Sequence, residues 1–319
     1  MEEQTWYEVF LENLHEQFPK KAQLTQEIMD LLCLEREAVY RRLRKDVPFP
    51  AHEVIKIAST WNISLDEILG IDTGKIMYRM QPFNYLDPTK QEFNNMQKRV
   101  SAIDHLRTTY QSEYMEVCNR LPRPLSIGFN TLYRFRIFDW AYQYNSGMYR
   151  EFSKISIPEF MQLEFDRYKK NIVHAKNTQY IFDQKIFDCL VYSVHYFHSI
   201  LLITDDEKEL IKKELHEMLD YLMEIATKGC YPETHNKVTL YISQLNIDTN
   251  YSYFYTEKLK VCRVHAFGKF DVSSYDANMV KNFRTWMNLK KRSSIQISEV
   301  NERQRIEYFV RQRKLVDGM

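Results

Sequence analysis

The segment from Leu24 to Gly70 constrains the fold of this chain more than any other. Its apolar residues recur at three- and four-residue spacing in short runs, a pattern typical of short amphipathic helices. One run begins at Thr25, and a second begins at Glu35 after a connection of only Cys33 and Leu34. Such a tight turn fixes the angle between two helices, so we expect the second helix to project outward from the bundle.

Apolar residues on one face of each helix predict that this segment has a small core of its own. The inward-facing residues of the first three helices are expected to be Ile28, Met29, Leu32, Val39, Leu43, Val54, Ile57 and Ala58. Pro48 and Pro50 end the second helix. A short last helix is expected from Ser64, with Glu67 at the capping-box position. An amphipathic helix over residues 5–17 precedes the bundle.

The outer face of the second helix is basic within an acidic segment. Residues 35–45 hold five basic and two acidic residues, whereas residues 1–72 hold 8 Lys and Arg against 14 Asp and Glu, a net charge of −6. Arginines on a projecting helix suit the base edges and phosphates of the DNA major groove. The negative total is an objection, because phosphate contacts dominate affinity for DNA. Arg41, Arg42, Arg44 and Lys45 also suit a solvated face, and the helices also suit a protein partner.

This segment resembles the Cro/repressor-like (XRE) family of helix-turn-helix transcriptional regulators, over about residues 22–72. The most specific element is IKIASTWNISLDEILG, and LEREAVYRRLR occupies the place of the turn and the recognition helix. The resemblance implies a lambda-repressor-like bundle that binds duplex DNA as a homodimer on two half-sites. It assigns Arg36, Glu37 and Arg41 to base edges. Tyr40, Arg44 and Lys45 are assigned to the DNA backbone.

Two residues depart from the family pattern. Met29 stands where the first helix of the motif usually has a small residue, which is expected to alter the packing angle of the two helices. Lys45 stands where a glycine usually follows the recognition helix, which predicts a longer recognition helix.

The rest of the chain predicts a mainly α fold. Residues 73–88 form the expected linker, which includes a short strand over residues 75–80. Helices are expected over residues 89–121, 128–144, 158–175, 185–202, 205–228, 275–290 and 299–315. Alternating apolar residues between 238 and 261 predict two or three antiparallel strands, and residues 294–298 predict another. Residues 89–319 are therefore expected to form an α-rich dimerisation and effector-sensing domain, with a small antiparallel sheet (α+β) from about residue 235.

The sequence contains no recognised catalytic motif. Only seven glycines occur, without Gly-x-Gly spacing, and neither G-x-S-x-G nor H-E-x-x-H is present. We therefore expect no enzyme, no catalytic residue and no cofactor. The five cysteines are widely spaced without a C-x-x-C pair, which fits a reducing compartment. The N-terminus does not read as a signal peptide, and the apolar run from Cys189 to Thr204 is too short to span a bilayer. We expect a cytoplasmic protein with no membrane partner.

Several features of the second region leave alternatives open. His195 and His198 are spaced for a metal pair, but apolar neighbours favour buried or interfacial histidines, and no metal site is assigned. A basic run over residues 277–298 suits solvent, flanking DNA or an anionic effector. The helix over residues 89–121 suits either a dimer interface or the core. Residues 238–319 are large enough to enclose a small-molecule or peptide effector. We predict a sequence-specific transcriptional regulator; the alternatives are an interaction or scaffold protein and, more remotely, an enzyme with an unrecognised site.

Overall fold

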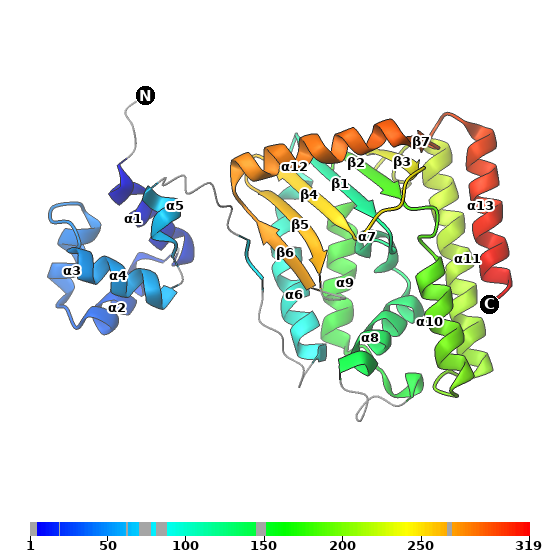
Figure 1. Cartoon of the computed structure of the whole chain (residues 1–319). Coiled ribbons are helices and arrows are strands. Elements are labelled where there is room, and N and C mark those ends of the chain that lie inside the picture. The colour runs from blue at the N-terminus through cyan, green and yellow to red at the C-terminus, as the bar shows by residue number, and fades with distance from the viewer. Residues whose placement is uncertain are drawn as a thin grey trace. The chain divides into compact units, whose positions relative to one another are not determined.

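The computed structural model describes residues 5–18, 20–61, 63–69, 78–80, 88–144, 151–266 and 270–319. The chain divides into two compact units, Met1–Lys75 and Ile76–Met319 (Figure 1). Each unit has its own apolar core. Most of the predicted linker, residues 73–88, lies outside the described residues. Arg79, in the expected short strand, forms an isolated antiparallel bridge with Ser273.

The first unit is a bundle of short helices. They are α1 (Trp6–Gln17), α2 (Lys21–Leu32), α3 (Arg36–Leu43), α4 (Ala51–Trp61) and α5 (Leu65–Leu69). Most of the expected inward residues are buried, while Met29, Leu32 and Leu43 are partly buried against the same core. Helix α2 begins before the predicted Thr25, whose hydroxyl donates to the Lys21 carbonyl from within the helix. The Glu67 side chain of the expected capping box lies outside the described residues.

Helix α3 ends earlier than the sequence predicts. Lys45 has a φ of 68°, so it takes the left-handed conformation that usually favours glycine. The Lys45 amide donates to the Arg42 carbonyl at 3.1 Å, and the Asp46 amide donates to the Arg41 carbonyl at 2.9 Å. These two bonds form the Schellman motif that closes a helix. The expectation of a longer helix was wrong, because the helix still ends in this turn, with Lys45 in the left-handed position that usually holds a glycine.

The second unit is built on a seven-stranded mixed sheet of order β6-β5-β4-β1-β2-β3-β7. Neighbouring strands β1, β2 and β3 are parallel, and the remaining pairs are antiparallel. The strands are β1 (Ser112–Cys118), β2 (Asn177–Phe182), β3 (Lys237–Ser243), β4 (Tyr251–Thr256), β5 (Lys260–Ala266), β6 (Phe270–Ser274) and β7 (Ser294–Gln296).

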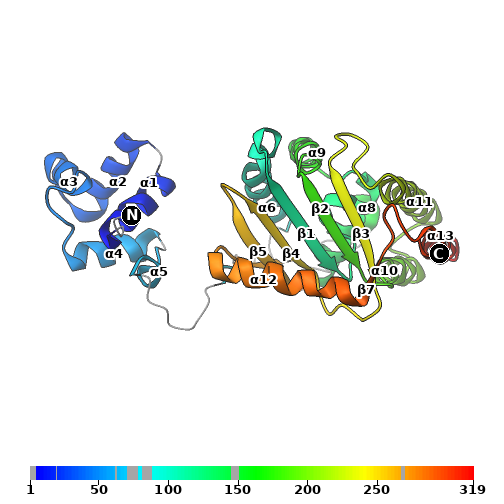
Figure 2. The same ribbon diagram turned by 90° about the horizontal axis from the view of Figure 1, so that it is seen from above.

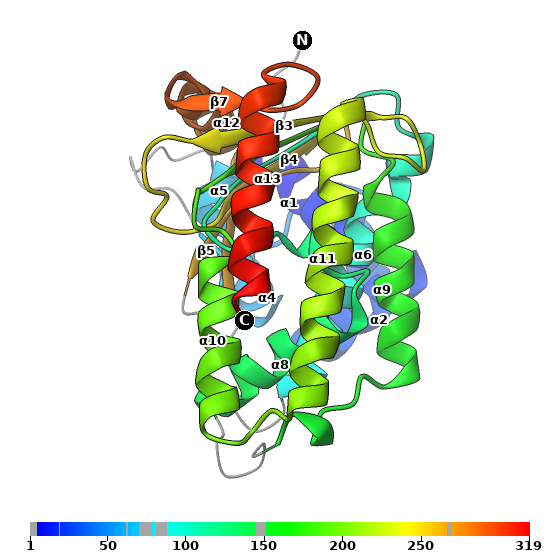
Figure 3. The same cartoon turned by 90° about the vertical axis from the view of Figure 1, so that its right-hand side faces the viewer.

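Helices cover both faces of this sheet (Figure 2). Helix α12 (Ala277–Leu289) packs Val280, Phe283 and Met287 against one face. The other face is covered by α6 (Pro88–Ile103), α8 (Asn130–Tyr144), α9 (Glu159–Ile172), α10 (Asp188–Ser199), α11 (Asp205–Lys228) and α13 (Glu302–Asp317). Of these, α10, α11 and α13 pack side by side (Figure 3). A short helix, α7 (Arg123–Ser126), follows β1.

The prediction of a mainly α fold with a small antiparallel sheet was wrong, because the unit is α/β. The expected helix over residues 89–121 stops at Ile103, and a short 3-10 helix then leads into β1. Strand β1 is buried along nearly its whole length, so it lacks the alternation of a half-exposed strand. Tyr114 and Val117 fall at a helical spacing by coincidence, although they lie in different cores on opposite faces of the sheet. Strand β2 is missed because its first three residues, Asn177, Thr178 and Gln179, are polar although Thr178 is buried.

Candidate functional site

Helix α3 is fixed to the first unit by one apolar and one ionic anchor. Val39 is fully buried in the core. Arg42 makes a bidentate ion pair with Glu53 of α4, at 2.7 Å from Nε to Oε2 and 2.9 Å from Nη2 to Oε1. The Tyr7 hydroxyl donates to the Arg42 carbonyl and accepts from the Phe49 amide, both at 3.1 Å. These contacts hold α3 against α1 and α4 and leave its opposite face to solvent.

The exposed face of α3 carries the residues that the sequence assigned to DNA. Arg36 and Arg44 lie over the half-buried Tyr40 ring, with their guanidinium carbons 5.6 Å and 5.7 Å from its centre. Arg44 also pairs with the exposed Glu37 at 3.4 Å. Arg41 is exposed, and its side chain makes no hydrogen bond or ion pair within the described parts of the chain. The face thus combines a stacked arginine pair with an uncommitted arginine.

Lys45 lies at the end of this face and is held by α1. Its Nζ lies 2.6 Å from Glu8 Oε1. This bond from Lys45, with a second from the Thr5 amide, lowers the pKa of Glu8 to about 2. A phosphate that binds Lys45 therefore has to displace a fully charged carboxylate.

The structure brings all six assigned residues, Arg36, Glu37, Tyr40, Arg41, Arg44 and Lys45, onto one helix and its C-terminal turn. It removes Arg42 from the solvated face on which the sequence placed it, because Arg42 turns toward Glu53. No local signal distinguishes Arg42 from Arg41, since Glu53 is supplied by another helix.

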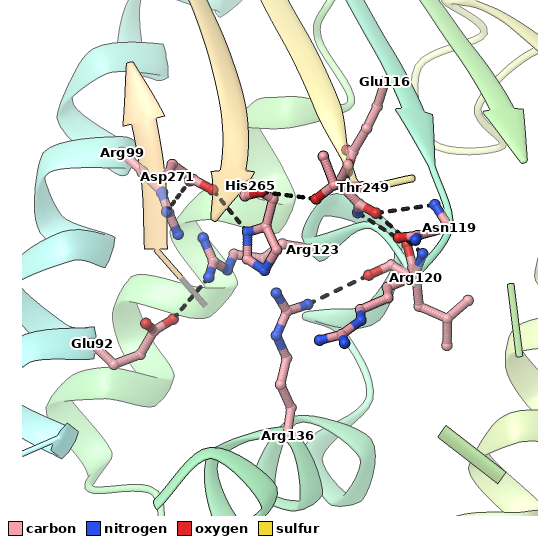
Figure 4. A network of polar contacts seen from close by, with 12 residues as sticks. Glu92, Arg99, Glu116, Asn119, Arg120, Arg123, Arg136, Thr249, His265 and Asp271 are labelled. Atoms are coloured by element: carbon pink, nitrogen blue, oxygen red, sulfur yellow. Dashed lines mark hydrogen bonds and ion pairs between the residues drawn. The ribbon is translucent and has the colours of Figure 1, made fainter. Parts of the chain in front are cut away.

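A second polar cluster occupies the C-terminal unit, beside the edge of the sheet where β1 ends (Figure 4). Its residues come from strands β1, β5 and β6 and helices α6, α7 and α8. We call it the arginine pocket: a cavity of about 70 Å³ lined by Arg99, Arg123, Arg136, Arg263, His265, Glu116 and Asp271, among others. The carboxyl ends of parallel strands are a common place for ligands in α/β folds.

Part of the charge in the arginine pocket is neutralised internally. Arg99 Nη2 lies 2.5 Å from Asp271 Oδ2, and His265 Nδ1 lies 3.1 Å from Asp271 Oδ1. Arg123 pairs with Glu92 at 3.5 Å. Burial alone would raise the pKa of Asp271, but the His265 hydrogen bond and the Arg123 charge lower it. These pairs account for two of the four arginines.

The other two arginines have no carboxylate partner within the described residues. Arg136 donates from Nη1 to the Leu121 carbonyl at 3.4 Å, and Arg263 has no ion pair there. Burial, together with the charge of Arg123, lowers the pKa of Arg136. Burial and the neighbouring Arg123 charge thus both oppose the positive charge of Arg136, although Glu92 and Asp271 favour it.

Glu116 is, with Asp271, one of the two carboxyls that line this pocket. Burial raises its pKa to about 7, against hydrogen bonds from the Tyr114 hydroxyl at 2.5 Å and Asn250 Nδ2 at 3.1 Å. Asp271 raises this pKa further, and Arg136 opposes the rise. Near neutral pH, Glu116 is therefore only partly charged and compensates the arginines poorly.

An apolar cavity of about 200 Å³ adjoins the arginine pocket. The two cavities share Arg136, Asn250 and His265 in their walls. We call the second cavity the apolar hollow; its apolar lining is Leu121, Leu132, Phe135, Trp140, Ile186 and Leu190. Arg120 and Asp139 are among the polar residues at this cavity.

Neither cavity was predicted from the sequence. Their residues run from Arg99 to Asp271, and only the missed strand β1 would have located their edge of the sheet. Neither of the two histidines weighed as a metal pair is buried: His195 is exposed, and the half-buried His198 pairs with Asp205 at 2.9 Å, so of the two expected alternatives the buried one is wrong. Within the described residues, no cluster of three or more His, Cys, Asp or Glu side chains is arranged to hold a metal ion.

Searches of protein-family models, curated proteins and solved structures returned no match. None of the helices in the described residues is both long enough and apolar enough to cross a membrane.

Proposed function

We propose that this chain is a cytoplasmic, sequence-specific DNA-binding transcriptional regulator, with α3 as its recognition helix. The observation that carries the proposal is that the two faces of α3 differ: one is anchored in the first unit, and the other is basic and exposed. Its inner face is anchored by Val39 and the Arg42–Glu53 pair, while Arg36, Arg41, Arg44 and Lys45 are exposed. A helix of this kind fits the major groove, which is about 12 Å wide in B-form DNA.

Each side chain has a distinct proposed role. Arg36 and Arg41 pair with guanine edges, since arginine can donate two hydrogen bonds to guanine O6 and N7. Glu37 lies beside them and discriminates against some bases. Tyr40, Arg44 and Lys45 bind the DNA backbone, which positions the helix without reading sequence. No catalytic role is assigned.

The proposed regulator acts as a homodimer. A single small module has too small a footprint for strong specificity, and two modules read half-sites about one helical turn apart. We place the dimer contacts in the unit Ile76–Met319. Light scattering on the full chain, with and without DNA, measures whether the protein is a dimer.

The alternative function is protein binding by the same helices. It is favoured by the net charge of −6 in residues 1–72 and by the acidic partners that Arg44 and Lys45 already have in Glu37 and Glu8. An interaction or scaffold protein of this kind would leave duplex DNA unbound.

Selection of bound duplexes from a random pool separates the two functions. The full chain is expected to enrich a two-part site with matching half-sites. Its affinity for that site should fall steeply with salt, because each phosphate contact releases counterions. A pool that stays random after repeated rounds, with no salt-dependent binding to any duplex, would leave the protein-binding function as the better account.

A further inference from the structure

The arginine pocket holds more positive charge than its own carboxyls balance. Four guanidinium groups, those of Arg99, Arg123, Arg136 and Arg263, face the carboxyls of Asp271, Glu92 and Glu116. Glu116 is largely neutral below pH 7, because its pKa is about 7. Uncompensated charge in a partly buried site is costly, since the desolvation penalty is several kcal/mol per ion.

Two arginines also have donors that nothing satisfies. Arg123 Nε and Arg99 Nη1 are buried without a hydrogen-bond partner in the described structure. The Arg123 side chain is nine-tenths buried. Buried donors are nearly always paired in folded proteins, so unpaired ones at a cavity indicate a missing acceptor. An anion with several oxygens is such an acceptor, and it also supplies the missing negative charge.

The adjoining apolar hollow indicates what is attached to the anion. Its walls include Leu121, Phe135 and Trp140, and it reaches the arginine pocket at Arg136 and His265. Figure 4 shows Arg123, Arg136 and His265 converging on one space. Small-molecule sites usually combine an apolar body with a few converging polar groups.

We propose that the arginine pocket and the apolar hollow together bind one small molecule, which carries an oxyanion on an apolar or aromatic body. The oxyanion, a phosphate or a carboxylate, binds Arg136 together with Arg123 and Arg263. The body lies against Phe135 and Trp140. Every residue that lines the two cavities belongs to the unit Ile76–Met319, so the site contains no residue of α3.

Isothermal titration of the full chain with four probes tests this site. Phenyl phosphate and benzoate carry both parts of the expected ligand, inorganic phosphate carries only the anion, and benzyl alcohol carries only the body. The tighter of the two aromatic anions should bind at least about tenfold more tightly than phosphate or benzyl alcohol, because burying a ring contributes about 1.5–3 kcal/mol. Whether phenyl phosphate or benzoate binds more tightly identifies the head group.

Charge variants connect the binding to the arginines. Arg136→Gln and Arg263→Gln should each weaken the tighter probe by about 10- to 100-fold, which corresponds to one lost charge-assisted hydrogen bond. Arg303→Gln is the matched control, because Arg303 is 85% exposed on α13 and does not line either cavity. Thermal unfolding of each variant checks that the variant folds. If Arg136→Gln does not fold, the affinity of Arg263→Gln for the probe tests the proposal.

Two results would overturn the proposal. One is that neither aromatic anion binds at about 1 mM, an affinity of about −4 kcal/mol. The other is that the folded arginine variants bind the probes as tightly as Arg303→Gln does, which would make the cluster a structural network only.

Discussion

At the residue scale, the proposed phosphate contact of Lys45 has to compete with the ion pair that Lys45 makes with Glu8. Glu8→Gln removes the competing charge and can keep the amide contact at Thr5 that caps α1. We expect about two- to fivefold tighter binding to every duplex at low salt, since an exposed ion pair is a weak competitor that salt screens. Fluorescence anisotropy over a salt series measures this, with Glu12→Gln on the same helix as control. An unchanged affinity would show that Lys45 does not contact phosphate.

A second residue-scale prediction concerns Glu116 and pH. Its pKa is about 7 in the folded chain and near 4.5 when unfolded, so folding favours the protonated form. Stability is therefore lost as pH rises from about 4.5 to 7, on the order of 3 kcal/mol in all. Glu116→Gln should be more stable than the parent by about 1–3 kcal/mol at pH 8 and nearly equal at pH 5. Urea unfolding at both pH values tests this, and an equal difference at each pH would contradict it.

At the element scale, Gly229 ends α11 in a conformation that other residues resist. Its φ is 69°, and an added Cβ would lie 2.4 Å from Glu299 Cδ. Gly229→Ala should therefore cost at least about 1–2 kcal/mol. Gly318→Ala, after α13, is the matched control, because its Cβ would meet atoms no closer than 3.5 Å. Denaturant unfolding compares them, and equal stabilities would mean that α11 tolerates another end.

Elements with a visible period were predictable from sequence. Helix α11 spans the expected Asp205–Lys228, because apolar residues recur along one face and Gly229 stops it. Strand β1 was not, because both of its faces are buried and no alternation remains. Strand β2 was not, because its first three residues are all polar, so its alternation in burial has no apolar pattern in the sequence. Because these two strands were not predicted, the parallel centre of the sheet was not predicted either, nor was the arginine pocket at its edge.

The two candidate sites differ in how far the sequence predicts them, because one is built from neighbouring residues and the other from residues far apart in the chain. The shared position of the six residues assigned to DNA was predictable, because five lie within one helix and its cap, where local periodicity sets their direction, and Lys45 follows directly. The partner of Arg42 is Glu53 on another helix, and the partner of Arg99 is Asp271, which lies 172 residues later in the chain. Such pairings depend on tertiary structure, which spacing along the chain does not reveal.

At the scale of the whole molecule, the separate cores predict two unfolding transitions. Ile28 and Ile225 are both fully buried, one in each unit. Ile28→Val and Ile225→Val remove the same methyl group at a cost of about 0.5–1.5 kcal/mol. In calorimetry of the full chain, each variant should lower the midpoint of a different transition. A single transition that both variants shift together would show that the units unfold as one.

The central claim is that α3 reads DNA sequence, and it rests on the different roles of Arg41 and Lys45. The most direct test is equilibrium titration of Arg41→Ala and Lys45→Ala, at several salt concentrations, on the selected site and a scrambled duplex. Arg41→Ala should cost about 1–3 kcal/mol on the selected site and little on the scrambled one. Lys45→Ala should weaken both duplexes about equally and flatten the salt slope by about one unit. Identical losses for the two variants on both duplexes would contradict the assignment of α3 as the recognition helix.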